Sequence, residues 1–327
     1  MSTRTTLIRL LADGSFRSGE ELARELNLSR SAVWKSMKRL GELGMEVHAV
    51  AGRGYSLAAP FELLDRERIL AAAGTTVGGA IRKLEVHEEI DSTNTYLMAQ
   101  KPPAGGVALV CLAEFQTKAR GRKGRSWLAP YGSGVCLSVG WTFDEQPSDF
   151  SALALALGVA IVRALGGLGI TGVQLKWPND VIWNRHKLAG ILTEMRGESP
   201  GPAYVVAGIG LNVRLPRDAV LDDRAALPAV DLARVCRGAT PDRNQLAGAL
   251  VREVIAALQQ FAETGFASFR EDWQAADGLA EAPVRLSRGR EVSIGTARGI
   301  DRHGALLFES RGEIRPIISG ELSLRPE

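Results

Sequence analysis

The sequence predicts an α+β protein built from several domains. Its 327 residues exceed the usual size of one domain, and 45% of them are hydrophobic against 24% charged, as in a folded chain with a large core. Residues 63–272 mix helices with strands that follow one another in hairpins, which argues against a repeated βαβ arrangement. Short helices precede this region and short strands follow it. We therefore expect three domains, at residues 1–60, 63–272 and 280–327.

The first domain is expected to begin with three short helices. Residues 5–12 form the first, Ser18 caps the second with Glu21 completing a capping box, and Ser29 caps the third. The third helix should turn one apolar face inward, because its apolar residues follow i, i+4, i+7 spacing; they are Val33, Met37 and Leu40.

The third helix also carries basic residues and no acid between positions 29 and 40. Two helices, a tight turn and a basic second helix are typical of a helix-turn-helix, whose second helix enters the DNA major groove. Residues 46–57 follow as a hairpin with a basic tip, which would form a wing. A solvated basic face is the plainer alternative. The predicted DNA contacts are Arg30, Lys35, Lys38, Arg39 and, on the wing, Arg53.

The central and final domains can be outlined from their apolar patterns. Strands are expected at residues 83–89, 107–115, 135–143, 173–177, 181–183, 188–195 and 204–213, a buried helix at 151–168 and an amphipathic helix at 245–263. Residues 214–242 are polar and give no readable pattern. Short strands around turns at 287–289, 301–304 and 311–312 predict a small C-terminal barrel.

Composition excludes several classes of protein. Three widely spaced cysteines (Cys111, Cys136 and Cys236) suit neither a disulfide framework nor a zinc knuckle. The longest uncharged apolar run, 152–162, is shorter than the roughly 20 residues of a membrane span. Arg9 interrupts any signal-peptide core. We expect a cytoplasmic protein that makes no membrane contact.

Familiar catalytic motifs are missing as well. The chain has no Gly-Lys dipeptide for a Walker loop and no G-x-S-x-G elbow for a nucleophilic serine. Its four histidines show no His-x-x-x-His pairing of the kind that binds zinc. A phosphate loop of that type, a covalent triad and a zinc centre are therefore not expected.

Polar motifs instead follow predicted strands. Asp91-Ser-Thr-Asn94 opens a helix, where a capping role is the plain alternative. Residues 116–127 hold five cations and no acid and end in Trp127, a pattern suited to a polyanion and a flat base, or to a solvated loop.

Two further motifs lie later in the chain. Lys176-Trp-Pro-Asn-Asp180 is followed by Lys187, and its amide and carboxylate suit Mg²⁺, although a simple turn has the same composition. Gly208-Ile-Gly-Leu-Asn212 lets a ligand approach the backbone closely. Each motif alone is a modest signal, but their joint order is specific.

Together these motifs resemble the biotin–protein ligases. The matching blocks are Asp91-Ser-Thr-Asn, Arg120-Gly-Arg-x-Gly-Arg-x-Trp127, Lys176-Trp-Pro-Asn-Asp180, Lys187-Leu-Ala-Gly-Ile-Leu192 and Gly208-Ile-Gly-Leu-Asn212. The helix-turn-helix and the C-terminal Gly320-Glu-Leu-Ser-Leu-Arg325 extend the resemblance over nearly the whole chain, to the bifunctional bacterial form that also represses the biotin operon.

The resemblance implies a fold and an activity. The central domain should have a class II aminoacyl-tRNA-synthetase-like mixed sheet, and the C-terminal domain an SH3-like barrel. Biotin and MgATP would give biotinyl-5′-AMP and pyrophosphate, and a lysine of biotin carboxyl carrier protein would then displace AMP. The adenylate would also act as corepressor, promoting a homodimer that binds operator DNA.

The resemblance also implies residue roles. The catalytic cations would be Arg120, Arg122 and Lys187, and the metal-facing residues Asn179 and Asp180. The biotin and nucleotide ligands would be Ser92, Thr93, Asn94, Gln116, Arg120, Gly121, Arg122, Trp127, Lys187 and Asn212.

One position departs from the family. Ala119 stands where relatives usually have glycine, and a positive φ there would strain the backbone by roughly 1 kcal/mol. Two alternatives stay open, a lipoate–protein ligase and a ligand-sensing transcription factor without ligase activity.

Overall fold

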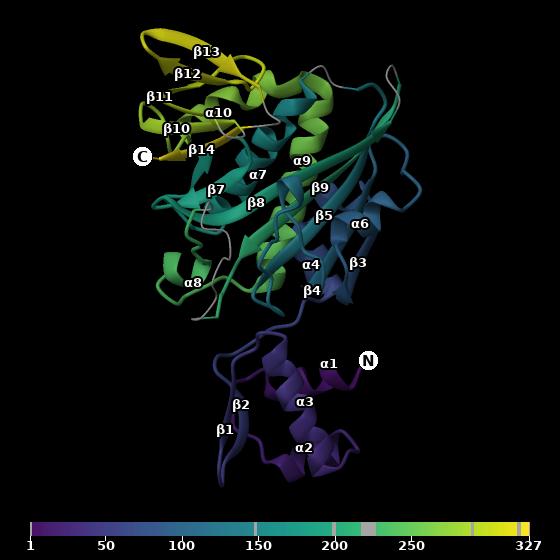
Figure 1. Ribbon diagram of the computed structural model, residues 1–327. Helices are drawn as coiled ribbons and strands as arrows, with labels where there is room; N and C mark the ends of the chain where they lie inside the picture. Colours follow the sequence, from purple (N-terminus) through teal and green to yellow (C-terminus); the bar gives the residue numbers. More distant parts are fainter. Residues whose placement is uncertain are drawn as a thin grey trace.

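The protein has three parts arranged in a row (Figure 1). The computed structural model describes residues 2–146, 149–197, 201–216, 227–288, 291–318 and 322–326. The N-terminal helices and hairpin lie at one end of the central sheet, and the C-terminal strands lie at the other end. This is the α+β architecture expected from the sequence.

The N-terminal part is a winged helix-turn-helix, as predicted. Its elements are α1 (Thr3–Leu11), α2 (Gly19–Glu25), α3 (Arg30–Glu42), β1 (Val47–Val50) and β2 (Gly54–Leu57). Ser18 accepts a hydrogen bond from the Glu21 amide, and Ser29 accepts one from the Ala32 amide, so both caps form where the sequence places them. The predicted inward face of α3 is buried.

The central part is a seven-stranded sheet in the order β3-β4-β5-β9-β8-β7-β6. Only β3 and β4 pair in parallel; the other neighbours are antiparallel. This parallel pair adds to the hairpins expected from the sequence and makes the sheet mixed. The strands are β3 (Ile81–Ile90), β4 (Ala108–Gln116), β5 (Gly134–Phe143), β6 (Gln174–Lys176), β7 (Asp180–Trp183), β8 (His186–Gly197) and β9 (Ala203–Asn212).

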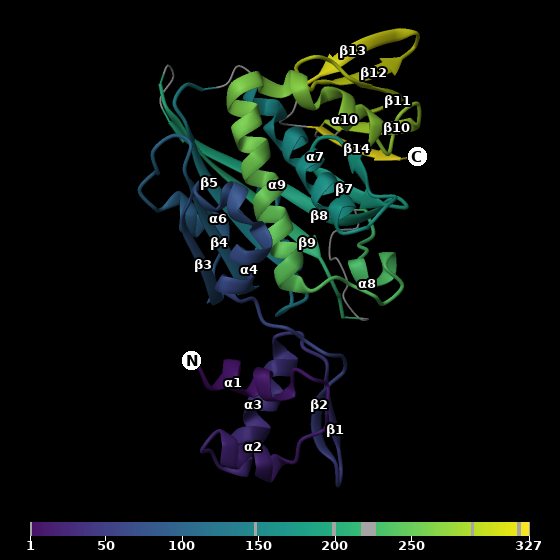
Figure 2. The ribbon, with the colours of Figure 1, turned by 180° about the vertical axis from the view of Figure 1, so that it is seen from behind.

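Helices cover both faces of this sheet. On one face, α4 (Arg66–Ala73), α5 (Thr75–Gly78), α7 (Leu153–Gly167) and α9 (Arg243–Thr264) enclose the main apolar core (Figure 2). The short helix α6 (Thr93–Met98) packs on the other face through a smaller cluster that includes Leu97, Cys111 and Tyr204. Residues 150–167 are apolar and long enough to cross a membrane, but most of this segment is buried in the main core.

The C-terminal part is a five-stranded antiparallel sheet in the order β13-β12-β11-β10-β14. Its strands are β10 (Pro283–Arg288), β11 (Glu291–Ile300), β12 (Leu306–Ser310), β13 (Glu313–Ile317) and β14 (Leu322–Pro326). Residue 289, the last of the first predicted turn, and residue 290 lie outside the described residues. Val284, Ile300 and Phe308 belong to the same buried cluster as the central helices, so the last two parts share one core.

Short elements complete the chain. The helices α4, α5, α8 (Leu232–Val235) and α10 (Arg270–Ala275) are not among the helices that the sequence predicts, because each is too short for a clear apolar period. The short 3-10 helices are η1 (Arg122–Gly124), η2 (Phe150–Ala152) and η3 (Gly265–Phe269).

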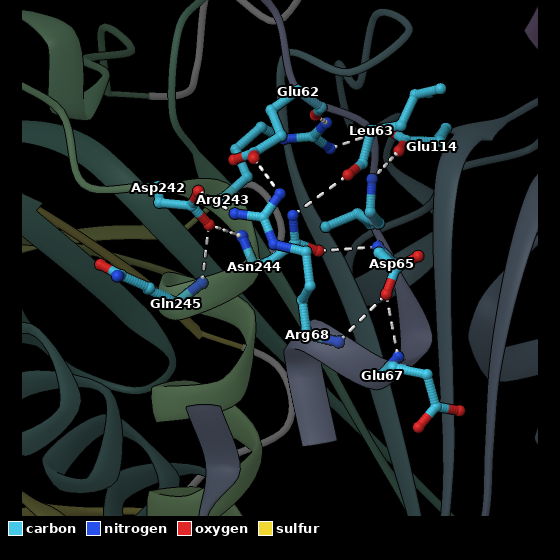
Figure 3. Close-up of polar contacts among 11 residues, drawn as sticks. Glu62, Leu63, Asp65, Glu67, Arg68, Glu114, Asp242, Arg243, Asn244 and Gln245 are labelled. Carbon is cyan, nitrogen blue, oxygen red and sulfur yellow. Dashed lines mark hydrogen bonds and ion pairs between the residues drawn. The ribbon is translucent and has the colours of Figure 1, made fainter. Parts of the chain in front are cut away.

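A buried polar cluster joins the linker after the winged domain to the central sheet (Figure 3). Arg243, at the start of α9, donates to Glu114 Oε2 at 2.8 Å, to the Gly134 carbonyl at 2.8 Å and to the Glu62 carbonyl at 2.7 Å. Glu114 also accepts a hydrogen bond from the Leu64 amide. The Arg243 and Glu114 side chains are only 7% and 3% exposed, so this ion pair is internal.

A second contact joins the winged domain to the segment that precedes β5. Tyr131 is buried in the apolar cluster of the winged domain, and its amide donates to the Leu43 carbonyl at the end of α3 (3.0 Å). Arg4 of α1 lies over the Tyr131 ring, 5.5 Å from its centroid, and pairs with Glu88 and Glu89 of β3. The winged domain is thus docked on the central domain by both apolar and charged contacts.

Replacing one partner of the internal pair should be costly. Arg243→Met leaves Glu114 buried without its cation, and we expect the free energy of unfolding to fall by about 3–5 kcal/mol in urea titrations. Arg315→Met, which removes an exposed arginine paired with Glu313, is the control and should cost less than about 1 kcal/mol. Equal losses in the two variants would contradict this role of Arg243.

Candidate active site

The candidate site lies on the α6 face of the central sheet, where glycines leave the strand backbone uncovered by side chains of their own. Gly208 of β9 pairs with Ser138 of β5 and Leu192 of β8. A Cβ at Gly208 would lie 2.1 Å from Asn94 Oδ1, so the amide of Asn94 rests directly on the strand backbone. The glycine motif predicted to allow close approach therefore does so, first to a side chain of α6.

Four neutral side chains form a hydrogen-bonded group beside this glycine. Gln116 Oε1 accepts from the Thr93 amide at 2.8 Å and from Thr93 Oγ1 at 3.1 Å. Ser138 Oγ lies 2.7 Å from Thr93 Oγ1 and 2.6 Å from Asn94 Oδ1. Thr93, Asn94 and Ser138 are buried, so the group is a neutral polar cluster on the α6 face of the sheet.

The sequence placed three of these residues in the site but missed Ser138. The signal was present, since Ser138 is a polar residue inside the apolar strand Gly134–Phe143. Ser92, also predicted as a ligand, is buried and caps α6 by accepting from the Thr95 amide at 3.5 Å. Its cap role is therefore visible, and its ligand role remains a prediction.

The arginine-rich segment 117–127 folds back toward the same face. Trp127 lies against two glycines: a Cβ at Gly210 would be 2.6 Å from Trp127 Cε2, and one at Gly190 would be 3.2 Å from Cζ3. Lys187 Nζ lies 5.4 Å from the centroid of the Trp127 ring. The structure thus brings Trp127, Lys187 and the glycine motif together as predicted.

The backbone of the arginine segment is regular at the unusual alanine. Ala119 is not among the described non-glycine residues with positive φ, so the substitution causes no backbone strain there. Its carbonyl accepts from the Trp127 amide at 3.1 Å, and the Gly121 amide donates to the Arg125 carbonyl at 2.7 Å. These bonds close the segment into a compact loop, which we call the arginine loop (residues 117–127).

The two predicted catalytic arginines have different surroundings. Arg120 pairs with Glu194 at 2.9 Å and donates to Thr95 Oγ1 at 3.3 Å. Arg122 donates to Asn179 Oδ1 at 3.3 Å, and within the described residues no ion pair to a carboxylate is recorded for it. Burial lowers the pKa of Arg122 from its usual value. Arg122 is therefore a partly desolvated cation that an anionic ligand would stabilise.

Asp180 anchors two lysines at the end of the site. Its carboxylate lies 2.7 Å from Lys176 Nζ and 2.6 Å from Lys187 Nζ. Burial alone would raise the pKa of Asp180, but the two ammonium groups lower it to about 2. The carboxylate is thus ionised and fixes the position of both cations.

Asn179 and Asp180 are both engaged with protein groups. Asn179 Nδ2 donates to the Ile191 carbonyl at 2.8 Å, while its oxygen accepts from Arg122. Within the described residues, no group of three or more His, Cys, Asp or Glu side chains could hold a metal ion. The predicted contact of this pair with Mg²⁺ therefore remains a prediction, since the oxygens of both side chains already accept from arginine or lysine.

Asn212 lies at the end of β9 and is buried. Its Nδ2 donates to the Val230 carbonyl at 3.1 Å and more weakly to the Lys187 carbonyl at 3.5 Å. The side chain therefore joins β9 to the chain that precedes α8. Its predicted contact with adenine remains a prediction.

A separate basic face lies on the winged domain. The predicted residues Arg30, Lys35, Lys38, Arg39 and Arg53 are all exposed. Arg30 pairs with Glu20 at 3.1 Å, and Arg53 lies over the Phe16 ring, 4.1 Å from its centroid. Trp34, which the sequence reasoning overlooked, is 56% exposed on α3.

Removing the shared carboxylate should weaken the fold in a pH-dependent way. Asp180→Asn leaves the buried Lys176 without its anion, so the free energy of unfolding should fall by about 3 kcal/mol at neutral pH. Because the pKa of Asp180 is lowered from 3.8 to about 2, this advantage of the wild type is complete above pH 3.8 and disappears as the pH falls through 2.

The control for this pH series is Asp272→Asn, which removes a half-exposed carboxylate paired with Arg163. It should change the free energy of unfolding by less than about 1 kcal/mol. A pH-independent gap between wild type and Asp180→Asn would contradict the assignment.

Comparison with known proteins agrees with this arrangement. Residues 86–212 match the Biotin/lipoate A/B protein ligase family, residues 3–56 match an HTH domain, and residues 282–325 match the Biotin protein ligase C terminal domain. The Bifunctional ligase/repressor BirA of Escherichia coli is 39% identical over 98% of this chain and 96% of that protein.

Further relatives extend the comparison. The Bifunctional ligase/repressor BirA of Bacillus subtilis is 30% identical over 98% of both chains. The structure of the biotin protein ligase from Aquifex aeolicus in complex with biotin and ATP aligns with a TM-score of 0.62 and 28% identity, covering 75% of this chain and 100% of that one. The chain therefore belongs to the biotin–protein ligase family, in its bifunctional ligase/repressor branch.

Proposed function

We propose that this protein adenylates biotin with ATP, transfers biotin to a lysine of biotin carboxyl carrier protein, and represses transcription when the adenylate is bound. The observation that carries the ligase function is that the neutral polar cluster of Thr93, Asn94, Gln116 and Ser138 lies on the same part of the sheet as partly buried Arg122 and the lysine pair at Asp180. The first suits the ureido ring of biotin, and the second suits the phosphates of ATP.

The chemistry requires positioning more than covalent catalysis. A biotin carboxylate oxygen attacks the α-phosphorus, the bond to the β,γ-pyrophosphate breaks, and the mixed anhydride remains. Arg122 and Lys187 offset the repulsion between the carboxylate and the triphosphate and stabilise the charge of the transition state. In the second step the carrier lysine attacks the acyl carbon, and AMP leaves. Neither step needs a protein nucleophile, which agrees with the missing triad.

The pocket side chains would act on biotin itself. Gln116 and Thr93 face the ureido group with neutral donors and acceptors, and Trp127 with Asn212 would bind adenine. Mg²⁺ would enter with ATP, and Asn179 and Asp180 would face it. When bound, the ion neutralises phosphate charge.

A lipoate–protein ligase shares the adenylation strategy and is the second candidate. Lipoate has no ureido ring, so it would leave the hydrogen-bonding groups of Gln116 and Thr93 unmatched. Labelled biotin and labelled lipoate, each with ATP, distinguish the two substrates. A sensor without ligase activity is disfavoured because Arg120, Arg122 and Lys187 are all retained.

For repression we propose a ligand-promoted homodimer in the cytoplasm. Two winged domains, each presenting an exposed basic α3, would bind two half-sites of an operator. We further propose that residues 1–60, 63–272 and 280–327 are the DNA-binding, catalytic and C-terminal domains. The docking of Tyr131 in the winged domain supports communication between the first two.

The role of Arg122 can be tested by biotin-dependent exchange of pyrophosphate into ATP. Arg122→Ala should lower the exchange rate by about 10²-fold, because one preorganised charge donor is lost. Arg122→Lys keeps a positive charge and should recover part of the rate. Arg315→Ala, a change on the exposed strand β13, should leave the rate unchanged. Normal exchange by Arg122→Ala would remove this arginine from the mechanism.

The regulatory proposal predicts ligand-dependent association. Biotin with ATP should shift the sedimentation coefficient toward a dimer and tighten binding to an operator fragment, because an ordered loop lowers the entropy cost of association. Lys35→Ala should weaken DNA binding and lower its salt dependence while leaving dimerisation intact. Unchanged association and DNA affinity with ligand would show that the winged domain answers to another signal.

A further inference from the structure

Glu194 of β8 lies between the pocket and the arginine loop. One edge of its carboxylate pairs with Arg120 at 2.9 Å, and Oε2 also accepts from Asn94 Nδ2 at 2.8 Å. Asn94 belongs to α6 and Arg120 to the loop, so a single side chain connects the two. No motif in the sequence analysis included Glu194.

Asn94 connects Glu194 to the polar group formed by α6 and β5. Its Nδ2 donates to Glu194 and to the Leu192 carbonyl at 3.2 Å, while its Oδ1 accepts from Ser138. Ser138 lies in turn 2.7 Å from Thr93 Oγ1. A continuous chain of hydrogen bonds therefore runs from the ureido-binding side of the pocket to the guanidinium of Arg120.

We infer that Glu194 is a positioning residue that latches the arginine loop over the biotin pocket. This inference rests on the proposed ligase function and deepens it. Glu194 accepts a hydrogen bond from Asn94 of α6 and forms an ion pair with Arg120 of the arginine loop. With Arg120 neutralised by Glu194, the charge that balances phosphate comes from Arg122 and Lys187.

The strength of the latch suits a loop that must open in each turnover. The Arg120 and Glu194 side chains are 39% and 23% exposed, so water and salt weaken their attraction. An ion pair of this exposure changes an opening equilibrium by about threefold. The latch thus slows the escape of the adenylate without trapping it.

The first test uses the free protein and requires no ligase activity. Subtilisin, which cleaves exposed chain without needing a basic residue, should cut Glu194→Gln within residues 117–127 about threefold faster than wild type. Arg120→Gln should give the same increase, and the double variant should be no faster than either single variant. Glu309→Gln is the matched control, because Glu309 also pairs with an arginine and its 28% exposure is close to that of Glu194. In this variant the arginine loop should be cut at the wild-type rate.

The second test measures release of labelled biotinyl-5′-AMP. Glu194→Gln should release it about threefold faster while the rate of pyrophosphate exchange stays within twofold of wild type. The latch is overturned if Glu194→Gln shows wild-type rates of both loop cleavage and adenylate release. It is also overturned if the cleavage rate of the double variant rises by the product of the two single increases. If wild type shows no biotin-dependent exchange, the proposed function fails, whereas the cleavage test still decides whether the latch exists.

Discussion

The internal pair between Arg243 and Glu114 fixes the frame on which the site depends. A buried charge is tolerated only with compensating partners, and the Arg243 guanidinium collects acceptors from the linker, β4 and β5 at once. Glu114 lies two residues before Gln116, where β4 ends and the arginine loop begins. Because the same pair also bonds the linker after the winged domain, the end of β4 and the attachment of the winged domain share this anchor.

The pairing of charges in the site explains how so many cations can lie together. Asp180 balances Lys176 and Lys187, and Glu194 balances Arg120. Arg122 has an amide partner instead, and burial lowers its pKa. The site therefore keeps a net positive charge, because Asp180 offsets only one of its two lysines and Arg122 has an amide partner. Such an arrangement attracts an anion without requiring the protein to reorganise during the reaction.

The sequence predicted local features well and distant contacts poorly. The caps at Ser18 and Ser29 depend on residues three positions away, so their pattern is readable. The contacts of Glu194 span 74 residues to Arg120 and 100 to Asn94. Only the pairing of β8 with β9, and the packing of α6 on them, brings these groups together. Family motifs located Gln116 and Lys187, but Glu194 lay outside every motif.

The arginine loop is connected to the DNA-binding domain by the chain itself. It begins where the Thr117 amide donates to the Ile90 carbonyl, and four residues after Trp127 the chain reaches Tyr131, whose amide donates to the Leu43 carbonyl at the end of α3. A ligand bound beside the loop would therefore act on a segment that is hydrogen-bonded to the end of α3. Energetic coupling needs a ligand with different affinity for two states of such a segment. The hydrogen bond from Tyr131 to Leu43 is the contact through which a change in the loop would act on α3. The buried Tyr131 ring fixes this contact.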